Sequence, residues 1–290
     1  MRFVGTPFTF AYEQVGNNCG LLGKNAAVEV DGAAYWMSDN GFFRYTGQLQ
    51  SMQCLVEDYV YDDLNTSSNQ LVYCGINNLF GEITWFYCTS GSNVVDRSVT
   101  YSYLDSTTDR PIWFTNASSI FPRTTWEDSA VFGLPHATQY DADTDTCDTV
   151  GNTDGISIYY EHETGVNYIK GGTSFAVPAS ITSGDYDITQ DQREGISFRG
   201  DGEFIMRVSR IIPDFITQTG NAIVQLDLRD YPNDAATSSP LGPFTLTPTT
   251  TKVDTRARAR QIALTISNTA VDSNWKLGTF RLDVHSGGRR

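Results

Sequence analysis

Short apolar–polar alternations joined by tight-turn dipeptides constrain the fold of this chain more than any other feature of its sequence. The stretch AAVEVDGAAYWMSDNGFFRYTG places Asp31-Gly32 and Asn40-Gly41 between runs rich in β-branched and aromatic residues. Asp-Gly and Asn-Gly tolerate the positive φ angles that two-residue hairpin turns require. The stretch therefore predicts three antiparallel strands. Because long amphipathic helical patterns are lacking elsewhere, the predicted fold class is all-β.

Blocks of this kind recur along the first part of the chain. LVYCGINNLFGEITWFYC with DRSVTYSYL forms a second block, and SAVFGLPHATQYDADTDT through DGISIYYEHETG forms a third. Repeated sheets of three or four antiparallel strands are typical of β-propeller blades. We therefore expect partial or small β-propeller-like repeats in residues 1–170, with a plain β-sandwich as the alternative. A short connecting helix is expected in LVEDYVYDDLN.

Longer alternating strands follow in the second part of the chain. They are FIMRVSRIIPDF, AIVQLDLRDYP, GPFTLTP, RARARQIALTIS and WKLGTFRLDV. In AIVQLDLRDY an apolar face of Val224, Leu226 and Leu228 opposes a polar face, which fits a sandwich with one solvated side. The paired glycines Gly171-Gly172 act as a hinge or a turn. The sequence thus predicts a meander domain over 1–170 and an antiparallel β-sandwich-like domain with a basic C-terminal strand over 171–290.

Charge is unevenly distributed along the chain. The net charge is −14, yet residues 251–290 hold eight Lys or Arg against three Asp, so this segment is +5 and residues 1–250 carry −19. Arg256, Arg258 and Arg260 stand at alternate positions, where side chains of one strand share a face. We interpret them, together with Arg281, as interface residues that pair with an acidic surface. The alternative is a solvated strand edge whose arginines prevent edge pairing.

Signatures of catalysis are lacking in the sequence. The three histidines stand in no HExxH motif and beside no credible nucleophile, and the chain has no GxSxG, Walker or GxGxxG motif. We therefore expect no enzymatic activity and no cofactor. Asp185, Asp187 and Asp191 are the candidates for a glycosidase carboxylate pair, but ordinary surface acids are the favoured interpretation.

One acidic loop has the beginning of a calcium-binding pattern. Asp141, Asp143 and Asp145 match the first three ligand positions of an EF-hand loop. However, Thr146 stands where that loop needs Gly, and Asn152 stands where it needs Glu. A solvated acidic loop is therefore favoured, and a calcium site is the alternative.

Aromatic residues are concentrated in the predicted strands. Consecutive aromatic residues on a strand place at least every second side chain inward. For Trp36 and Phe42 this favours core packing over carbohydrate stacking.

Cysteine usage and hydropathy indicate an intracellular setting. The five cysteines are scattered and have neither CxxC nor zinc-site spacing, so reduced and mostly buried thiols are expected. No apolar run reaches the length of about 18 residues that spans a bilayer, and the N-terminal segment lacks the apolar core of a signal peptide. We expect a soluble chain without a membrane anchor.

Four segments carry a resemblance to a known family. NAAVEVDGAAYWMSDNGFFRYTGQLQSMQCLVEDYVYDDLN, GEITWFYCTSGSNVVDRSVTYSYLD, FIMRVSRIIPDF and WKLGTFRLDVHSGGRR resemble tail proteins of short-tailed bacteriophages, of the packaged-DNA stabilisation or tail-nozzle kind. The resemblance implies a β-propeller-like platform with added β-domains. It also implies a homo-oligomeric ring, commonly a hexamer, that is assembled in the host cytoplasm and lies in the virion tail next to the portal, its adaptor and the tail fibres. Such a ring forms the channel that retains and releases the genome.

The charge of the chain agrees with this resemblance. An acidic channel repels the phosphates of DNA and leaves the duplex mobile, whereas a basic lining would hold it. The favoured function is therefore a non-catalytic structural virion protein whose acidic channel passes genomic DNA without sequence-specific binding. The alternatives are a receptor- or carbohydrate-binding β-module at the tail tip and a glycan-degrading β-protein.

Overall fold

The protein is built from antiparallel β-sheets, as the sequence predicts. The computed structural model describes residues 2–117, 121–141, 156–191, 195–197, 203–231, 234 and 240–289. The chain divides into two compact units, Met1–Thr164 and Gly165–Arg290, here called the N-terminal and C-terminal units. Each unit has a hydrophobic core of its own. No helix in the described ranges is long and apolar enough to cross a membrane.

The first sheet of the N-terminal unit is a four-stranded meander. Its strands are hydrogen-bonded in chain order: β3 (Ala27–Val30), β4 (Ala33–Ser38), β5 (Gly41–Tyr45) and β6 (Leu49–Met52). Asp31 and Gly32 both have positive φ in the turn between β3 and β4, as the Asp-Gly dipeptide predicts. The second turn lies one residue earlier than predicted, because Gly41 already pairs with Ser38 as the first residue of β5.

The second sheet is another four-stranded meander. Its strands, again in chain order, are β7 (Tyr73–Asn77), β8 (Glu82–Tyr87), β9 (Arg97–Ser102) and β10 (Trp113–Asn116). The predicted connecting helix precedes it as α1 (Glu57–Tyr61), which buries Val60, and a 3-10 helix follows at Thr66–Leu71. The two meanders begin at Ala27 and Tyr73, so they repeat at the interval expected of blade-like sheets.

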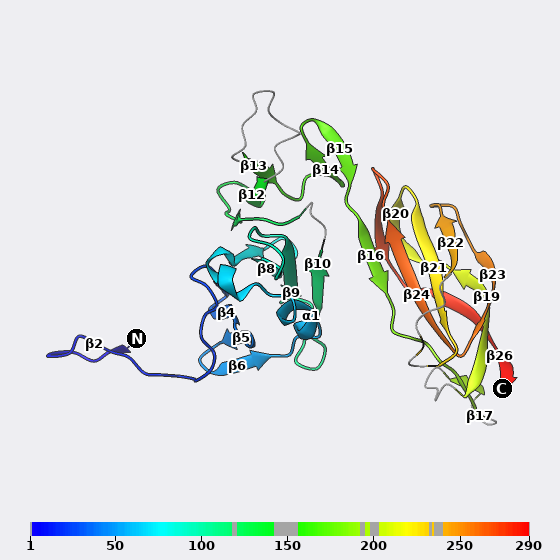
Figure 1. Ribbon diagram of the computed structural model, residues 1–290, viewed down its shortest axis with the longest axis horizontal. Coiled ribbons are helices and arrows are strands. Elements are labelled where there is room, and N and C mark those ends of the chain that lie inside the picture. Colours follow the sequence, from blue (N-terminus) through cyan, green and yellow to red (C-terminus); the bar gives the residue numbers. More distant parts are fainter. Residues whose placement is uncertain are drawn as a thin grey trace. The chain divides into compact units, whose positions relative to one another are not determined.

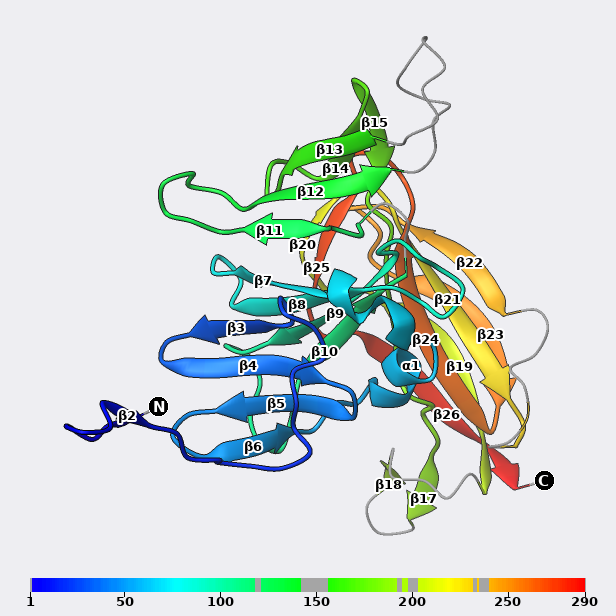
Figure 2. The ribbon, with the colours of Figure 1, turned by 60° about the vertical axis from the view of Figure 1, so that its left-hand side comes forward.

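The third sheet contains three strands, and a small hairpin precedes all three sheets. The strands of the sheet are β11 (Thr125–Glu127), β12 (His136–Asp141) and β13 (Ile156–Glu161). Figure 2 shows the three sheets of this unit in succession. The hairpin consists of β1 (Arg2–Phe3) and β2 (Phe10–Ala11), and it stands away from the sheets in Figure 1.

Aromatic rings hold the first two sheets together. Phe42 of β5 is fully buried, and its ring lies 5.0 Å from Trp85 of β8 and 4.8 Å from Trp113 of β10. The Trp85 indole donates a 3.0 Å hydrogen bond to the Ala26 carbonyl, so its buried N–H is satisfied. The prediction that Phe42 belongs to the core is confirmed. Trp36 is only half-buried, because alternation along β4 turns the neighbouring Tyr35 inward instead.

The third sheet packs on the second through Trp126. Its indole lies directly over Gly75 of β7, where an added Cβ would meet the ring at 2.4 Å. The ring also lies 6.0 Å from Phe86 and 4.5 Å from the His162 ring. The small residue at position 75 is therefore what lets the two sheets approach.

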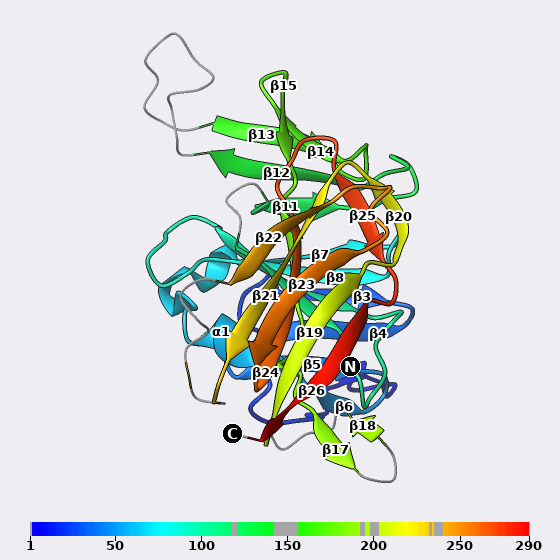
Figure 3. The same cartoon turned by 90° about the vertical axis from the view of Figure 1, so that its right-hand side faces the viewer.

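The C-terminal unit is a β-sandwich. One sheet contains β16 (Ala179–Thr182), β24 (Gln261–Asn268), β21 (Ala222–Arg229) and β22 (Leu241–Leu246) in that order. The other contains β23 (Val253–Ala259), β19 (Phe204–Ile212) and β26 (Arg281–Arg289), which lie side by side in Figure 3. The apolar face predicted for β21 is confirmed, because Val224 and Leu226 are fully buried between the sheets.

Three smaller two-stranded sheets complete the described part of the unit. They are β14 (Asn167–Lys170) with β15 (Thr173–Ala176), β17 (Thr189–Asp191) with β18 (Gly195–Ser197), and β20 (Phe215–Thr219) with β25 (Asn274–Leu277). Gly171 and Gly172 both have positive φ and form the two-residue turn between β14 and β15. The glycine pair is therefore a turn inside the C-terminal unit, and the division between units falls a few residues before it.

The described cysteines are reduced. Cys54, Cys74 and Cys88 are buried and Cys19 is partly buried, and none forms a disulfide. Burial raises the pKa of the Cys54 and Cys88 thiols to about 11. Cys147 lies outside the described residues. The four described thiols thus fit the expected role as small apolar side chains.

Candidate functional site

The candidate site is the solvent-facing side of the sheet formed by β23, β19 and β26. Along β23 the small side chains Thr255, Ala257 and Ala259 are buried, whereas Arg256 and Arg258 are exposed. This is the period of two that a strand with one solvated face requires. The sequence VDTRARA therefore places its alanines in the core and its arginines in water.

Strand register brings further basic side chains into line with Arg258. Arg207 of β19 is exposed and lies directly opposite Arg258, and on its other side it lies opposite exposed His285 of β26. Residues directly opposite each other across antiparallel strands have Cα atoms about 4.5–5.5 Å apart. These three side chains, called the basic row, thus run across the whole sheet.

The neighbouring row on the same three strands has the opposite character. Arg210 lies between Asp254 and Asp283, with Nε 3.0 Å from Asp254 Oδ1 and Nη1 3.2 Å from Asp283 Oδ2. Lys252 Nζ lies 3.1 Å from Asp254 Oδ2. Hydrogen bonds from Arg210 and Lys252 lower the pKa of the Asp254 carboxyl. The charges of this row are therefore paired within the row.

The basic row has no such compensation. Arg207, Arg256 and Arg258 have no carboxylate partner in the described part of the chain. Like charges directly opposite each other on a sheet are destabilising, by roughly the 0.2–1 kcal/mol that a favourable pair contributes. Two guanidinium groups facing each other therefore cost stability in the isolated chain, and an anionic partner would remove that cost.

Two of the four predicted interface arginines differ in position from the other two. Arg260 lies at the bend between β23 and β24, where its Nη1 donates a 2.9 Å hydrogen bond to the Glu203 carbonyl. The prediction of one continuous strand through RARARQIALTIS is wrong, because the chain crosses here from one sheet of the sandwich to the other. Arg281 is exposed at the start of β26, opposite Ile212, and so lies beyond the row of Arg210.

None of the other predicted site residues that the structure describes belongs to the strands of this sheet. Asp143 and Asp145 lie outside the described residues, and Asp141 is the last residue of β12. No group of three or more His, Cys, Asp or Glu side chains within the described ranges is arranged to hold a metal ion. Asp185 Oδ2 forms a 2.5 Å ion pair with Arg229 Nη1, which gives this carboxylate a structural partner.

Arg207 and His285 are the members of the site that sequence reasoning missed. The alternation in FIMRVSRII and RLDVHSGG shows that both side chains face outward, since their neighbours Met206, Val208 and Val284 pack inward. Nothing in either segment shows which residue lies opposite which. The alternation of buried side chains also changes at Arg260. Odd-numbered positions are buried up to Ala259, and the even-numbered Ile262 begins the next buried series.

The chain was compared with known proteins. No model of a known protein family matches it, and no curated protein sequence matches it.

Proposed function

We propose that this protein is a non-catalytic structural component of a bacteriophage tail, a ring-forming subunit of the nozzle or genome-retention type. The observation that carries the proposal is the basic row: exposed arginines face each other without a counter-charge on one sheet, in a chain that is otherwise strongly acidic. The resemblance of four sequence segments to tail proteins of short-tailed phages supplies the family.

The partner of the basic row in this proposal is the acidic surface of the next copy in the ring. Residues 1–164 hold 21 Asp and Glu against 6 Lys and Arg, a net charge of −15, whereas residues 165–290 hold 13 against 14 and carry +1. Guanidinium groups pair bidentately with carboxylates, which fixes register as well as adding attraction. The acidic counterpart that the row requires is therefore present on every copy.

The same charge division fits passage of DNA. A ring whose lumen is lined by the acidic unit repels the duplex along its whole path, so the genome moves without binding at each step. A sequence-reading protein would instead need a basic face complementary to the grooves and backbone of DNA.

Charge reversal in the basic row tests the proposal. Wild-type protein is expected to form closed rings by light scattering and negative-stain imaging at low salt, and the rings should weaken as salt rises. Arg207→Glu with Arg258→Glu should give folded monomers. Lys276→Glu, on exposed β25 of the same unit, reverses a charge away from the row and should leave assembly unchanged.

Three outcomes contradict the proposal. Wild-type protein that stays monomeric at the highest soluble concentration would overturn the ring. Rings that persist in the double variant would overturn the role of the basic row. Duplex DNA that binds wild-type protein and not the double variant would identify the row as a phosphate-binding surface instead.

A further inference from the structure

The segment formed by residues 2–15, called the N-terminal arm, exposes an unusual amount of apolar surface. Its only sheet pairing is the short hairpin of β1 with β2, in which Phe3 packs edge-on against Phe10 at 6.0 Å. The hairpin stands clear of the sheets in Figures 1 and 2. Six large apolar side chains on the arm are exposed: Phe3, Val4, Phe8, Phe10, Tyr12 and Val15.

Three aromatic side chains of the arm lie close together in the sequence. Phe8, Phe10 and Tyr12 stand at alternate positions and are 76%, 48% and 81% exposed. The three rings lie within five consecutive residues, in β2 and in the segments directly beside it, and are here called the aromatic edge. Contiguous exposed apolar surface of this kind marks an interaction site.

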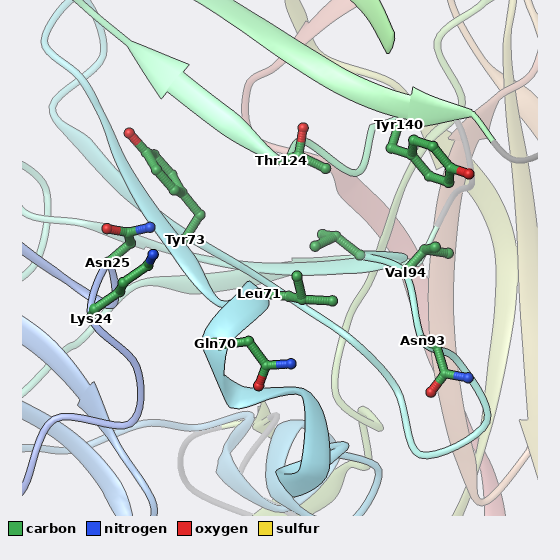
Figure 4. A pocket seen from close by; sticks show the side chains of 10 residues that line it. Lys24, Asn25, Gln70, Leu71, Tyr73, Asn93, Val94, Thr124 and Tyr140 are labelled. Atoms are coloured by element: carbon green, nitrogen blue, oxygen red, sulfur yellow. The ribbon is translucent and has the colours of Figure 1, made fainter. Parts of the chain in front are cut away.

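An open pocket lies on the N-terminal unit itself. It has a volume of about 430 Å³. That volume is within the range of about 300–1,000 Å³ that is typical of ligand pockets. Figure 4 shows Tyr73 and Tyr140 on opposite sides of the pocket, with Leu71 between them and Val94 on the side of Tyr140. Its lining residues are Lys24, Asn25, Gln70, Leu71, Tyr73, Asn93, Val94, Val95, Thr124 and Tyr140.

The floor of the pocket is apolar and incompletely covered. Leu71 and Val94 are 38% and 37% exposed, and Tyr140 is 40% exposed, although all three line a concave surface. Aromatic rings placed in this pocket would cover these aliphatic groups. Lys24 supplies the only positive charge of the lining.

We infer that the N-terminal arm of one copy inserts its aromatic edge into this pocket on a second copy of the chain. The three aromatic side chains of the edge bury on the order of 150–250 Å² each when fully covered. This approaches the roughly 800 Å² that each partner contributes to a standard interface. The arm and the pocket thus match in size and polarity.

The contact joins two different surfaces of the same chain, and it is therefore heterologous. A heterologous contact repeats from copy to copy and either closes a ring or extends a filament. The inference deepens the proposed function, since it rests on the same ring, but it uses an apolar contact where the basic row uses a charged one. Salt separates the two, because screening weakens the charged contact and leaves apolar burial intact.

Complementation between two variants tests the arm and the pocket together. The arm variant carries Phe8→Asp, Phe10→Asp and Tyr12→Asp, and the pocket variant carries Leu71→Glu and Val94→Glu. Each alone should be monomeric by light scattering. Mixed one to one, they should form a dimer and nothing larger, because only one intact arm and one intact pocket meet.

Matched controls place the same charges elsewhere on the arm and elsewhere on the N-terminal unit. Thr9→Asp, Ala11→Asp and Gln14→Asp place three carboxylates on the arm and leave its aromatic rings intact. Leu79→Glu and Leu104→Glu alter leucines that are 61% and 66% exposed and lie outside the pocket. Both controls should assemble as wild-type protein does. Assembly of the arm or pocket variant as wild type, or a mixture that stays monomeric, would overturn the inference.

A labelled synthetic peptide of residues 2–15 provides a measurement that does not depend on the ring. It should bind the arm variant saturably, bind the pocket variant at least tenfold more weakly, and keep its affinity as salt rises. Absence of saturable binding to the arm variant overturns the inference. If rings persist in both variants and are lost on charge reversal of Arg207 and Arg258, the inference fails while the proposed function stands.

Discussion

The two units of this protein fill their hydrophobic cores with different kinds of side chain. The core of the N-terminal unit is organised around rings, with Phe42, Trp85 and Trp113 in mutual contact. The core of the C-terminal unit is mainly aliphatic, with fully buried residues such as Val224 and Leu226. Small successive meanders need large side chains that reach from one sheet to the next, whereas two stacked sheets about 10 Å apart are filled by interdigitating aliphatic groups.

The units also differ in how their charges are balanced. The N-terminal unit has a net charge of −15 and the C-terminal unit +1, and the C-terminal unit concentrates unpaired arginines on one sheet. This difference shows that a strongly negative net charge of the whole chain is compatible with a local basic surface. Composition averaged over 290 residues does not reveal it.

The largest effect should come from removing a ring from the aromatic core. Trp85→Ala deletes a fully buried indole and removes one of the two hydrogen bonds that the Ala26 carbonyl accepts, so we expect a loss of about 3–5 kcal/mol in the free energy of unfolding. Leu226→Ala is the aliphatic counterpart in the other unit. Urea denaturation followed by fluorescence and circular dichroism measures both, and a larger loss for Leu226→Ala would contradict the comparison.

A pH effect should separate the partly buried His162 of the N-terminal unit from the exposed His285 of the C-terminal unit. Burial, together with the positive charge of Arg123, lowers the pKa of His162 to about 3, and Arg123 Nε donates a 2.9 Å hydrogen bond to His162 Nε2. In the unfolded chain His162 binds a proton as the pH falls below 6.5, whereas in the folded chain it does so only near pH 3. The stabilising contribution is therefore complete above pH 6.5 and is lost as pH falls towards 3, on the order of 2–4 kcal/mol.

His162→Gln tests this linkage, since Gln retains an acceptor for Arg123 and does not titrate. The variant should show a flatter dependence of unfolding free energy on pH between 6.5 and 4 than wild-type protein, measured by urea denaturation at several pH values. His285→Gln, on the exposed face of β26, should keep the wild-type slope. An unchanged slope in His162→Gln would show that other groups govern the acid response.

A smaller effect is expected at the join between the second and third sheets. Gly75→Ala would put a Cβ within 2.4–2.7 Å of the Trp126 side chain, so the ring must shift. Overpacking of this kind costs about 1–3 kcal/mol. Gly91→Ala, where an added Cβ meets nothing within 4 Å, is the control. Equal stability of the two variants would show that Trp126 moves without cost.

The smallest effect should be a gain in stability. Arg258→Glu places a carboxylate opposite Arg207, which replaces a like-charge pair by an opposite-charge pair and should add roughly 0.2–1 kcal/mol at low salt. The measurement is made on dilute protein, so that assembly does not contribute. Lys276→Glu should produce no gain. A destabilised Arg258→Glu variant would show that the arginines of the row do not oppose each other.

The sequence by itself determined the local structure of this protein. Turn dipeptides such as Asp31-Gly32 specify hairpins through the φ angles they permit, and the alternation in VDTRARA decides which side chains face water. For the same reason the exposed positions of Arg256 and Arg258 could be predicted from a few neighbouring residues. The change from odd-numbered to even-numbered buried positions between Ala259 and Ile262 marks the bend at Arg260. It can be interpreted only if the two segments are assigned to different sheets.

Only the tertiary structure decided which of these side chains meet. Arg207, Arg258 and His285 are separated by more than twenty residues along the chain, and their alignment depends on the register of β19 with both β23 and β26. A shift by one residue would turn every side chain of a strand to the other face, so register is set by burial of the whole sandwich and not by any single segment. The ion pairs that neutralise Arg210, and the lack of one for Arg207 among the described residues, follow from that register.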